Sequence, residues 1–129
     1  MCQMLLSINP VYVESILRGT KLFEYRKFRC RPDVDKIIIY ATAPWKQVVG
    51  EAEIEYIVED DVLSVWNQTK LYSGITYEFF RKYYDGKKTA FAYRLKNVVI
   101  YEKPLSLEDI GVSCAPQSYR YLSINLPLF

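Results

Sequence analysis

One uninterrupted apolar run limits what this chain can fold into more than any other feature. Residues 36–42, KIIIYAT, contain three consecutive isoleucines, which predicts a central strand covered on both faces. The connection APWKQ leads to residues 47–58, in which glutamates alternate with Ala52, Ile54 and Tyr56. This alternation predicts a strand with a solvated glutamate face and an apolar core face. Because the connection is short, we expect the two strands to be neighbours.

The remaining segments add further strands, with helices inserted at two points. An apolar stripe between Pro10 and Gly19 predicts a short helix, and residues 61–86 have helical spacing in two pieces broken near Ser73–Gly74. The pattern predicts a single α+β domain, residues 1–129, built as a small mixed β-barrel of about six strands with covering helices. The other expected strands are residues 4–8, 22–26, 88–95, 97–104 and 116–124, with a tight turn at Lys96–Asn97.

The chain contains no histidine, which excludes Ser-His and Cys-His nucleophiles and His-ligated metals. Cys2, Cys30 and Cys114 are odd in number and lack a metal-binding spacing, so neither a disulfide framework nor a zinc site is expected. No segment approaches the length of a membrane span, and the start of the sequence lacks a signal pattern. We therefore expect a cytoplasmic protein without a metal or cofactor.

The segment GTKLFEYRK, residues 19–27, combines three cations and a carboxylate with apolar residues. In a strand, alternation directs Phe23 and Tyr25 to the core and Glu24 and Arg26 to the opposite face. That opposite face has two interpretations. It is either an exposed ion pair of little energetic weight or the lining of a partly desolvated polar cleft.

The spacing of Gly19, Lys21, Glu24 and Arg26 is similar to the G-x-K-x-x-E-x-R signature of ASCH domains, a branch of the PUA-like superfamily. The segment LLSINPVYVESIL resembles the opening strand and helix of that family, and IIIYATAP with VVGEAEI resembles its central strand pair. This resemblance implies a small barrel surrounded by helices, with a cleft lined by the signature residues. It also implies binding of RNA or of a nucleobase-like ligand.

Two further segments supply candidate ligand-binding residues. The sequence YATAP places Tyr40 and Thr42 where a buried strand ends, and Thr42 bonds either a ligand or the backbone of the turn. The sequence PQSYRYL, which resembles the ending of a prokaryotic ASCH subgroup, contains Gln117, Ser118 and Tyr119. An amide beside aromatic rings suits base recognition and stacking. The alternative for this segment is a strand that only closes the barrel.

The favoured function is an RNA-binding, regulatory module whose cleft accepts a base or a nucleotide. Basic side chains near the cleft would attract phosphates; they are Lys21, Arg26, Arg29 and Arg31. The segment YEFFRKYYDGKK interleaves basic and aromatic residues, which predicts either an amphipathic covering helix or a second surface for phosphates and bases. The sequence leaves the oligomeric state and the identity of the RNA open.

The alternative function is that of an enzyme. A subset of ASCH proteins resembles metal-independent amidohydrolases that act on acylated cytidine-like nucleosides, and a ribonuclease is the other enzymatic interpretation. Lys21 and Glu24 are the candidate catalytic residues, with Glu78 as a further candidate base. Glu24 occupies the position where the amidohydrolase-like subset has threonine, and this departure favours the binding module.

Overall fold

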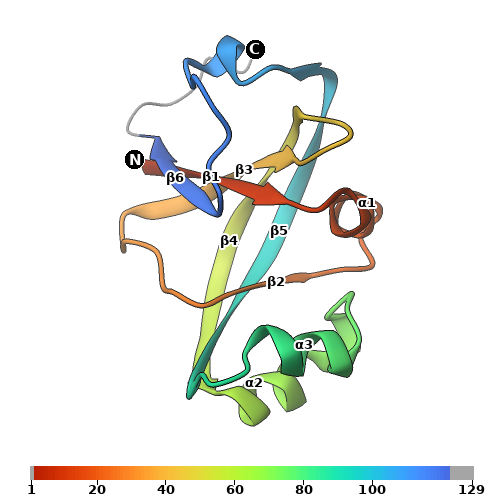
Figure 1. Ribbon diagram of the computed structural model, residues 1–129, viewed down its shortest axis with the longest axis vertical. Coiled ribbons are helices and arrows are strands. Elements are labelled where there is room, and N and C mark those ends of the chain that lie inside the picture. Colours follow the sequence, from red (N-terminus) through yellow and green to blue (C-terminus); the bar gives the residue numbers. More distant parts are fainter. Residues whose placement is uncertain (1, 123–129) are drawn as a thin grey trace.

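A mixed six-stranded sheet organises the chain, and the helices lie at its margins (Figure 1). This computed structural model describes residues 2–122. The strand order is β2-β5-β4-β3-β1-β6, with β1 and β3 parallel and the other pairs antiparallel. The predicted α+β class is confirmed. The elements are β1 (Cys2–Ile8), α1 (Pro10–Arg18), β2 (Phe23–Arg26), β3 (Val34–Ala41), β4 (Gln47–Asp61), α2 (Val62–Thr69), η1 (Lys70–Tyr72), α3 (Tyr77–Tyr83), β5 (Thr89–Leu105), η2 (Glu108–Ile110) and β6 (Tyr119–Leu122).

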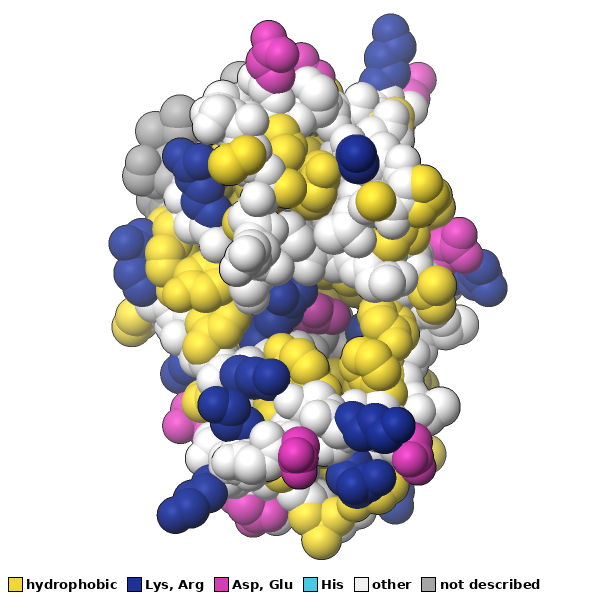
Figure 2. Space-filling view, in the orientation of Figure 1, with side chains coloured by type: hydrophobic (Ala, Val, Ile, Leu, Met, Phe, Trp, Pro, Cys, Tyr) yellow, Lys and Arg dark blue, Asp and Glu magenta, His cyan; other side chains and the backbone are white. Residues whose placement is uncertain are grey.

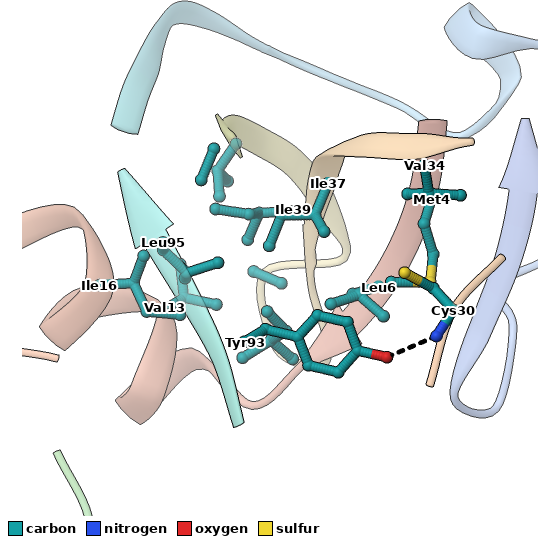
Figure 3. Packing of buried hydrophobic residues seen from close by; sticks show 14 of the residues in the cluster. Met4, Leu6, Val13, Ile16, Cys30, Val34, Ile37, Ile39, Tyr93 and Leu95 are labelled. Atoms are coloured by element: carbon teal, nitrogen blue, oxygen red, sulfur yellow. Dashed lines mark hydrogen bonds between the residues drawn. The ribbon is translucent and has the colours of Figure 1, made fainter. Parts of the chain in front are cut away.

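Strand β3 lies inside the core on both faces, as its sequence predicts. Ile37 and Ile39 join the larger apolar cluster, where Figure 3 shows them together with Val13 and Ile16 of α1. Ile38 belongs to a second cluster, and all three isoleucines are fully buried. Burial of one such side chain stabilises the fold by about 1.5–3 kcal/mol. The predicted pairing of β3 with β4 is confirmed.

Strand β5 continues through the segment in which a tight turn was expected, so that prediction is wrong. Asn97 adopts a φ of 50°, yet the chain does not reverse there. The register passes from Glu53 opposite Lys96 to Glu51 opposite Val99, which leaves two residues of β5 facing one of β4. A β-bulge therefore accounts for the turn-like backbone inside a continuous strand.

The glutamate face predicted for β4 is only partly exposed. Glu51 is 9% exposed; it accepts a hydrogen bond from the Tyr101 hydroxyl at 3.0 Å and pairs with Lys36 at 2.7 Å. Tyr56, which was expected in the core, is 49% exposed. The register of β4 against β5 shifts twice between Glu51 and Tyr56. Because each shift changes which face a side chain occupies, strict alternation fails along this strand.

The helices begin and end where local sequence places their caps. The Asn9 side chain accepts a hydrogen bond from the backbone N–H of Val11, and Gly19 ends α1 with a φ of 85°, a conformation that glycine adopts without strain. The Thr76 hydroxyl accepts from the backbone N–H of Phe79 and caps α3. Within residues 2–122, none of the helices has the length and apolarity needed to cross a membrane.

The two ends of the sheet, β2 and β6, are joined by side chains instead of a backbone ladder. Arg26 Nη1 donates to Ser118 Oγ at 3.2 Å. The next contact stacks Phe28 on Tyr119, with ring centroids 4.1 Å apart. A third contact places the guanidinium of Arg31 4.3 Å from the centre of the Tyr121 ring. The predicted barrel is thus an open sheet whose ends meet through these three contacts, which we call the seam.

We expect Tyr93→Phe to lower the free energy of unfolding by about 1–3 kcal/mol, because it leaves buried backbone groups without a partner. The Tyr93 hydroxyl accepts from the Cys30 N–H at 2.8 Å (Figure 3) and donates to the Phe28 carbonyl at the same distance. Tyr56→Phe, at an exposed tyrosine, is the matched control and should change stability by less than about 0.5 kcal/mol. Urea denaturation measures both, and equal effects would contradict the role of the Tyr93 hydroxyl.

Candidate functional site

A small cavity lies between β2, the junction of β1 with α1, and α3. Its volume is about 180 Å³, below the roughly 300–1,000 Å³ of clefts for drug-sized ligands, so it suits one small ring system. Figure 2 shows a hollow at mid-height, with basic and acidic side chains inside it and apolar ones around it. The lining residues are Ser7, Ile8, Asn9, Tyr12, Lys21, Glu24, Tyr25, Arg26, Ile75, Phe79 and Tyr83.

A buried ion pair forms one wall of this cavity. Glu24 Oε2 accepts a hydrogen bond from Arg26 Nε at 3.0 Å and lies 2.8 Å from Arg26 Nη2 in an ion pair, and each side chain is 9% exposed. Arg26 Nη2 also donates to the Ser7 carbonyl at 3.0 Å. Phe23 points the other way, into an apolar cluster with α2 and α3, and Tyr25 packs in that cluster while it also lines the cavity. The pair therefore lies in a cleft, and not on an exposed strand surface.

Lys21 is the second charged group of the cavity, and it is 2% exposed. Its ammonium donates to the Ser73 carbonyl at 2.6 Å and lies 4.9 Å from the centre of the Tyr25 ring. Burial lowers the pKa of Lys21 to about 8, although the nearby Glu24 carboxylate opposes this shift. Gly74 leaves room for the Lys21 side chain, because a Cβ on residue 74 would lie only 2.5 Å from Lys21 Cβ.

Aromatic rings from two helices complete the wall of the cavity. Tyr12 of α1 and Phe79 of α3 have ring centroids 5.4 Å apart, and the rings of Phe79 and Tyr83 are parallel within 7°. Tyr12 was not predicted to belong to a site, whereas Phe79 and Tyr83 lie in the segment YEFFRKYYDGKK, for which a surface for phosphates and bases was one of two interpretations. The alternation of basic and aromatic residues in that segment is the signal for this interpretation.

The other predicted site residues lie outside the cavity. Ser118 contacts Arg26 at its edge, and Tyr119 belongs to the seam. Tyr40 is 5% exposed in an apolar cluster, and Gln117 is exposed. The structure thus brings together Lys21, Glu24 and Arg26, with Ser118 beside them, but does not place Tyr40, Gln117 or Tyr119 in the cavity.

Two further candidates also lie elsewhere. The Thr42 N–H donates to the Ile8 carbonyl at 3.0 Å, and the Thr42 carbonyl accepts from the backbone of the following turn. Glu78 pairs with Arg81 on the exposed side of α3. All three cysteines are free thiols, and the described residues contain no group of three or more metal-ligating side chains.

An open sheet, a seam of side chains and a cleft lined by the signature residues together define a PUA-like domain. The chain belongs to the ASCH domain family, which matches residues 6–105. Glu24 and Arg26, the signature residues on β2, line the cleft together with Lys21.

Known proteins resemble this chain over most of its length. An ASCH domain-containing ribonuclease from Zymomonas mobilis is 31% identical over 122 residues, which are 91% of this chain and 82% of that protein. The crystal structure of an ASCH protein from Zymomonas mobilis superposes with a TM-score of 0.84 at 29% identity, covering 93% of this chain and 87% of that one. The large ribosomal subunit protein uL22 of Ureaplasma parvum is 30% identical over 87 residues, and the match spans only 28% of its length.

We expect Lys21→Met to remove a pH-dependent part of the stability. The pKa of Lys21 falls from 10.5 to about 8 on folding, so between these values the unfolded chain holds more protons than the folded one. The contribution of Lys21 to stability therefore rises with pH, by up to about 1.4 kcal/mol per pH unit. Denaturation between about pH 8 and pH 10 should show the wild type gaining stability relative to the variant. Parallel pH profiles would contradict a desolvated Lys21.

Proposed function

We propose that the protein binds single-stranded RNA and holds one unpaired base in the cleft. The observation that carries this proposal is the combination, in one small cavity, of a buried carboxylate, two buried cations and aromatic walls. Sequence-specific RNA recognition commonly takes unpaired bases, stacks them on aromatic rings and bonds their edges. The cleft contains aromatic rings for stacking and charged groups that can bond the edge of a base.

Hydrogen-bonding groups in the cleft suit the edge of a base. Both the hydrogen bond and the ion-pair contact from Arg26 are to Oε2 of Glu24, and within residues 2–122 Oε1 accepts no hydrogen bond, so it is free to accept from an amino group. The Lys21 ammonium has three N–H groups and donates one to Ser73. Phe79, which is 43% exposed, provides a ring on which the base can stack.

Basic side chains near the cleft suit the phosphates of a strand. Figure 2 shows several of them below the hollow, over the region of α3. Lys27, Lys82, Lys87 and Lys88 are exposed and make no ion pair within the described chain. Two cations predicted to attract phosphates, Arg29 and Arg31, are instead paired with Glu59 and Asp33. With a net charge of +2, binding should be moderate and should weaken steeply with salt.

We expect Phe79→Ala to weaken binding of an eight-nucleotide single-stranded RNA by about 5- to 150-fold, the range for loss of one stacked base. Tyr77→Ala is the matched control, because Tyr77 lies on the same helix with 46% exposure but packs on Trp66 outside the cleft. Fluorescence anisotropy at constant salt measures both affinities. Equal losses in the two variants would show that the cleft does not hold a base.

A second candidate function is cleavage of the bound RNA, and the relatedness to a ribonuclease from Zymomonas mobilis favours it. In metal-independent cleavage the 2′-hydroxyl attacks phosphorus, a base removes its proton and an acid protonates the departing 5′ oxygen. Glu24 and Lys21 are a carboxylate and an amine in one cavity, so they can fill these two roles. Deacylation of an acylated cytidine, the other enzymatic alternative, would also use Lys21 as a catalytic residue.

If the wild type cleaves single-stranded RNA in the presence of a chelator, Lys21→Met should lower the rate by about 10²- to 10⁴-fold, the usual effect of losing an acid or base catalyst. Lys82→Met, at an exposed lysine of α3, is the control and should keep the wild-type rate. The assay follows a labelled oligonucleotide on a denaturing gel. Cleavage that is unchanged in Lys21→Met would exclude the cleft as its site.

A further inference from the structure

We propose that the seam between β2 and β6 is a second nucleotide-binding position, at which Tyr119 and Phe28 stack the base that follows the one in the cleft. This inference rests on the proposed function, because it concerns the path of the same RNA strand. It adds a contact surface outside the cavity, built from the aromatic pair of the seam and from Lys27.

The seam begins at the cleft. Arg26, which lines the cavity, contacts Ser118, and the next contact between the same two segments is Phe28 on Tyr119. The aromatic pair is therefore the immediate neighbour of the cavity along the surface. An RNA strand that leaves the cleft past Arg26 and Ser118 would meet these rings next.

The exposed fraction of the Tyr119 side chain indicates that this ring does more than join the two ends of the sheet. Phe28 covers one face of it and Tyr121 packs edge-on at 5.4 Å, yet 39% of Tyr119 remains exposed. Figure 2 shows apolar side chains bordered by basic ones on the side of the hollow where β6 lies. An accessible aromatic ring next to cations is the arrangement that holds single-stranded nucleic acid without regard to sequence.

Lys27 connects the cleft with the aromatic pair. Its ammonium lies 4.5 Å from the centre of the Tyr83 ring, and Tyr83 lines the cavity. Lys27 makes no ion pair within residues 2–122, and it directly precedes Phe28. Its charge is therefore available to the phosphate between the two bases. By contrast, the exposed Tyr56 lies on β4, a strand rich in glutamate and aspartate, where a phosphate would be repelled.

The test compares the affinities of 5′-AMP and of the oligoadenylates A2, A4 and A8 for the wild type and for seam variants. Wild-type affinity should rise from AMP to A4. Tyr119→Ala should lose about 5- to 150-fold in affinity for A4, the effect of losing one stacked base, and should bind AMP as the wild type does. Tyr119→Trp should keep the affinity for A4, because it restores a flat ring. Tyr56→Ala is the matched control and should change neither affinity.

The proposed contact between Lys27 and a phosphate is tested by the salt dependence of binding. Lys27→Gln should reduce the slope of log affinity against log salt for A4 by about 0.7, the value for one phosphate of a single strand. Circular dichroism and melting of each variant confirm that it is folded, and Tyr119→Trp provides a second test if Tyr119→Ala melts early.

The outcomes separate this inference from the function on which it rests. If Tyr119→Ala binds A4 as tightly as the wild type while Phe79→Ala does not, the seam is not a binding position and the cleft remains one. If Tyr119→Ala loses affinity and Phe79→Ala does not, the seam binds RNA and the proposed role of the cleft is wrong. If the wild type binds none of the oligonucleotides, both proposals are wrong.

Discussion

Arg26 ties three separate parts of the chain together with one guanidinium group. It bonds Glu24 within β2, the Ser7 carbonyl near the end of β1 and Ser118 just before β6. A buried ion pair is stable only when its remaining hydrogen-bonding groups are also satisfied, and loss of one partner commonly costs about 3–5 kcal/mol. The same residue thus holds the two ends of the sheet together and forms the wall of the cleft.

The cavity exists because side chains, and not backbone hydrogen bonds, close the sheet. A backbone ladder between β2 and β6, the two ends of the sheet, would bring these strands to about 4.8 Å and leave no room for a ligand beside β2. The polar side chains of β2 occupy this gap, and Tyr12, Phe79 and Tyr83 cover its sides. The architecture therefore combines a rigid, apolar sheet interior with a polar opening at one margin, which is where the family's signature residues lie.

Much of the fold could be predicted from local patterns. The triple isoleucine of β3, the Asn9 and Gly19 caps and the Thr76 cap act through neighbouring residues, so sequence alone reveals them. The bulge at Asn97 was missed because its turn-like backbone has the same local signature as a hairpin. Only the long partner strand β4, which pairs on both sides of the bulge, keeps β5 continuous. The burial of Glu51 was also missed, because it depends on the register shifts between β4 and β5.

The sequence by itself determined that Phe23 and Tyr25 share one face of β2 and that Glu24 and Arg26 share the other, because alternation along a strand is a local property. It also identified Lys21, Glu24 and Arg26 as one group through their spacing. Tertiary structure alone decided that Ser118 joins them and that Tyr40 does not. It also decided that Phe79 and Tyr83 of a covering helix form the opposite wall. Contacts between segments about 50 to 90 residues apart depend on how the sheet curls and where its ends meet, and no local pattern encodes that geometry.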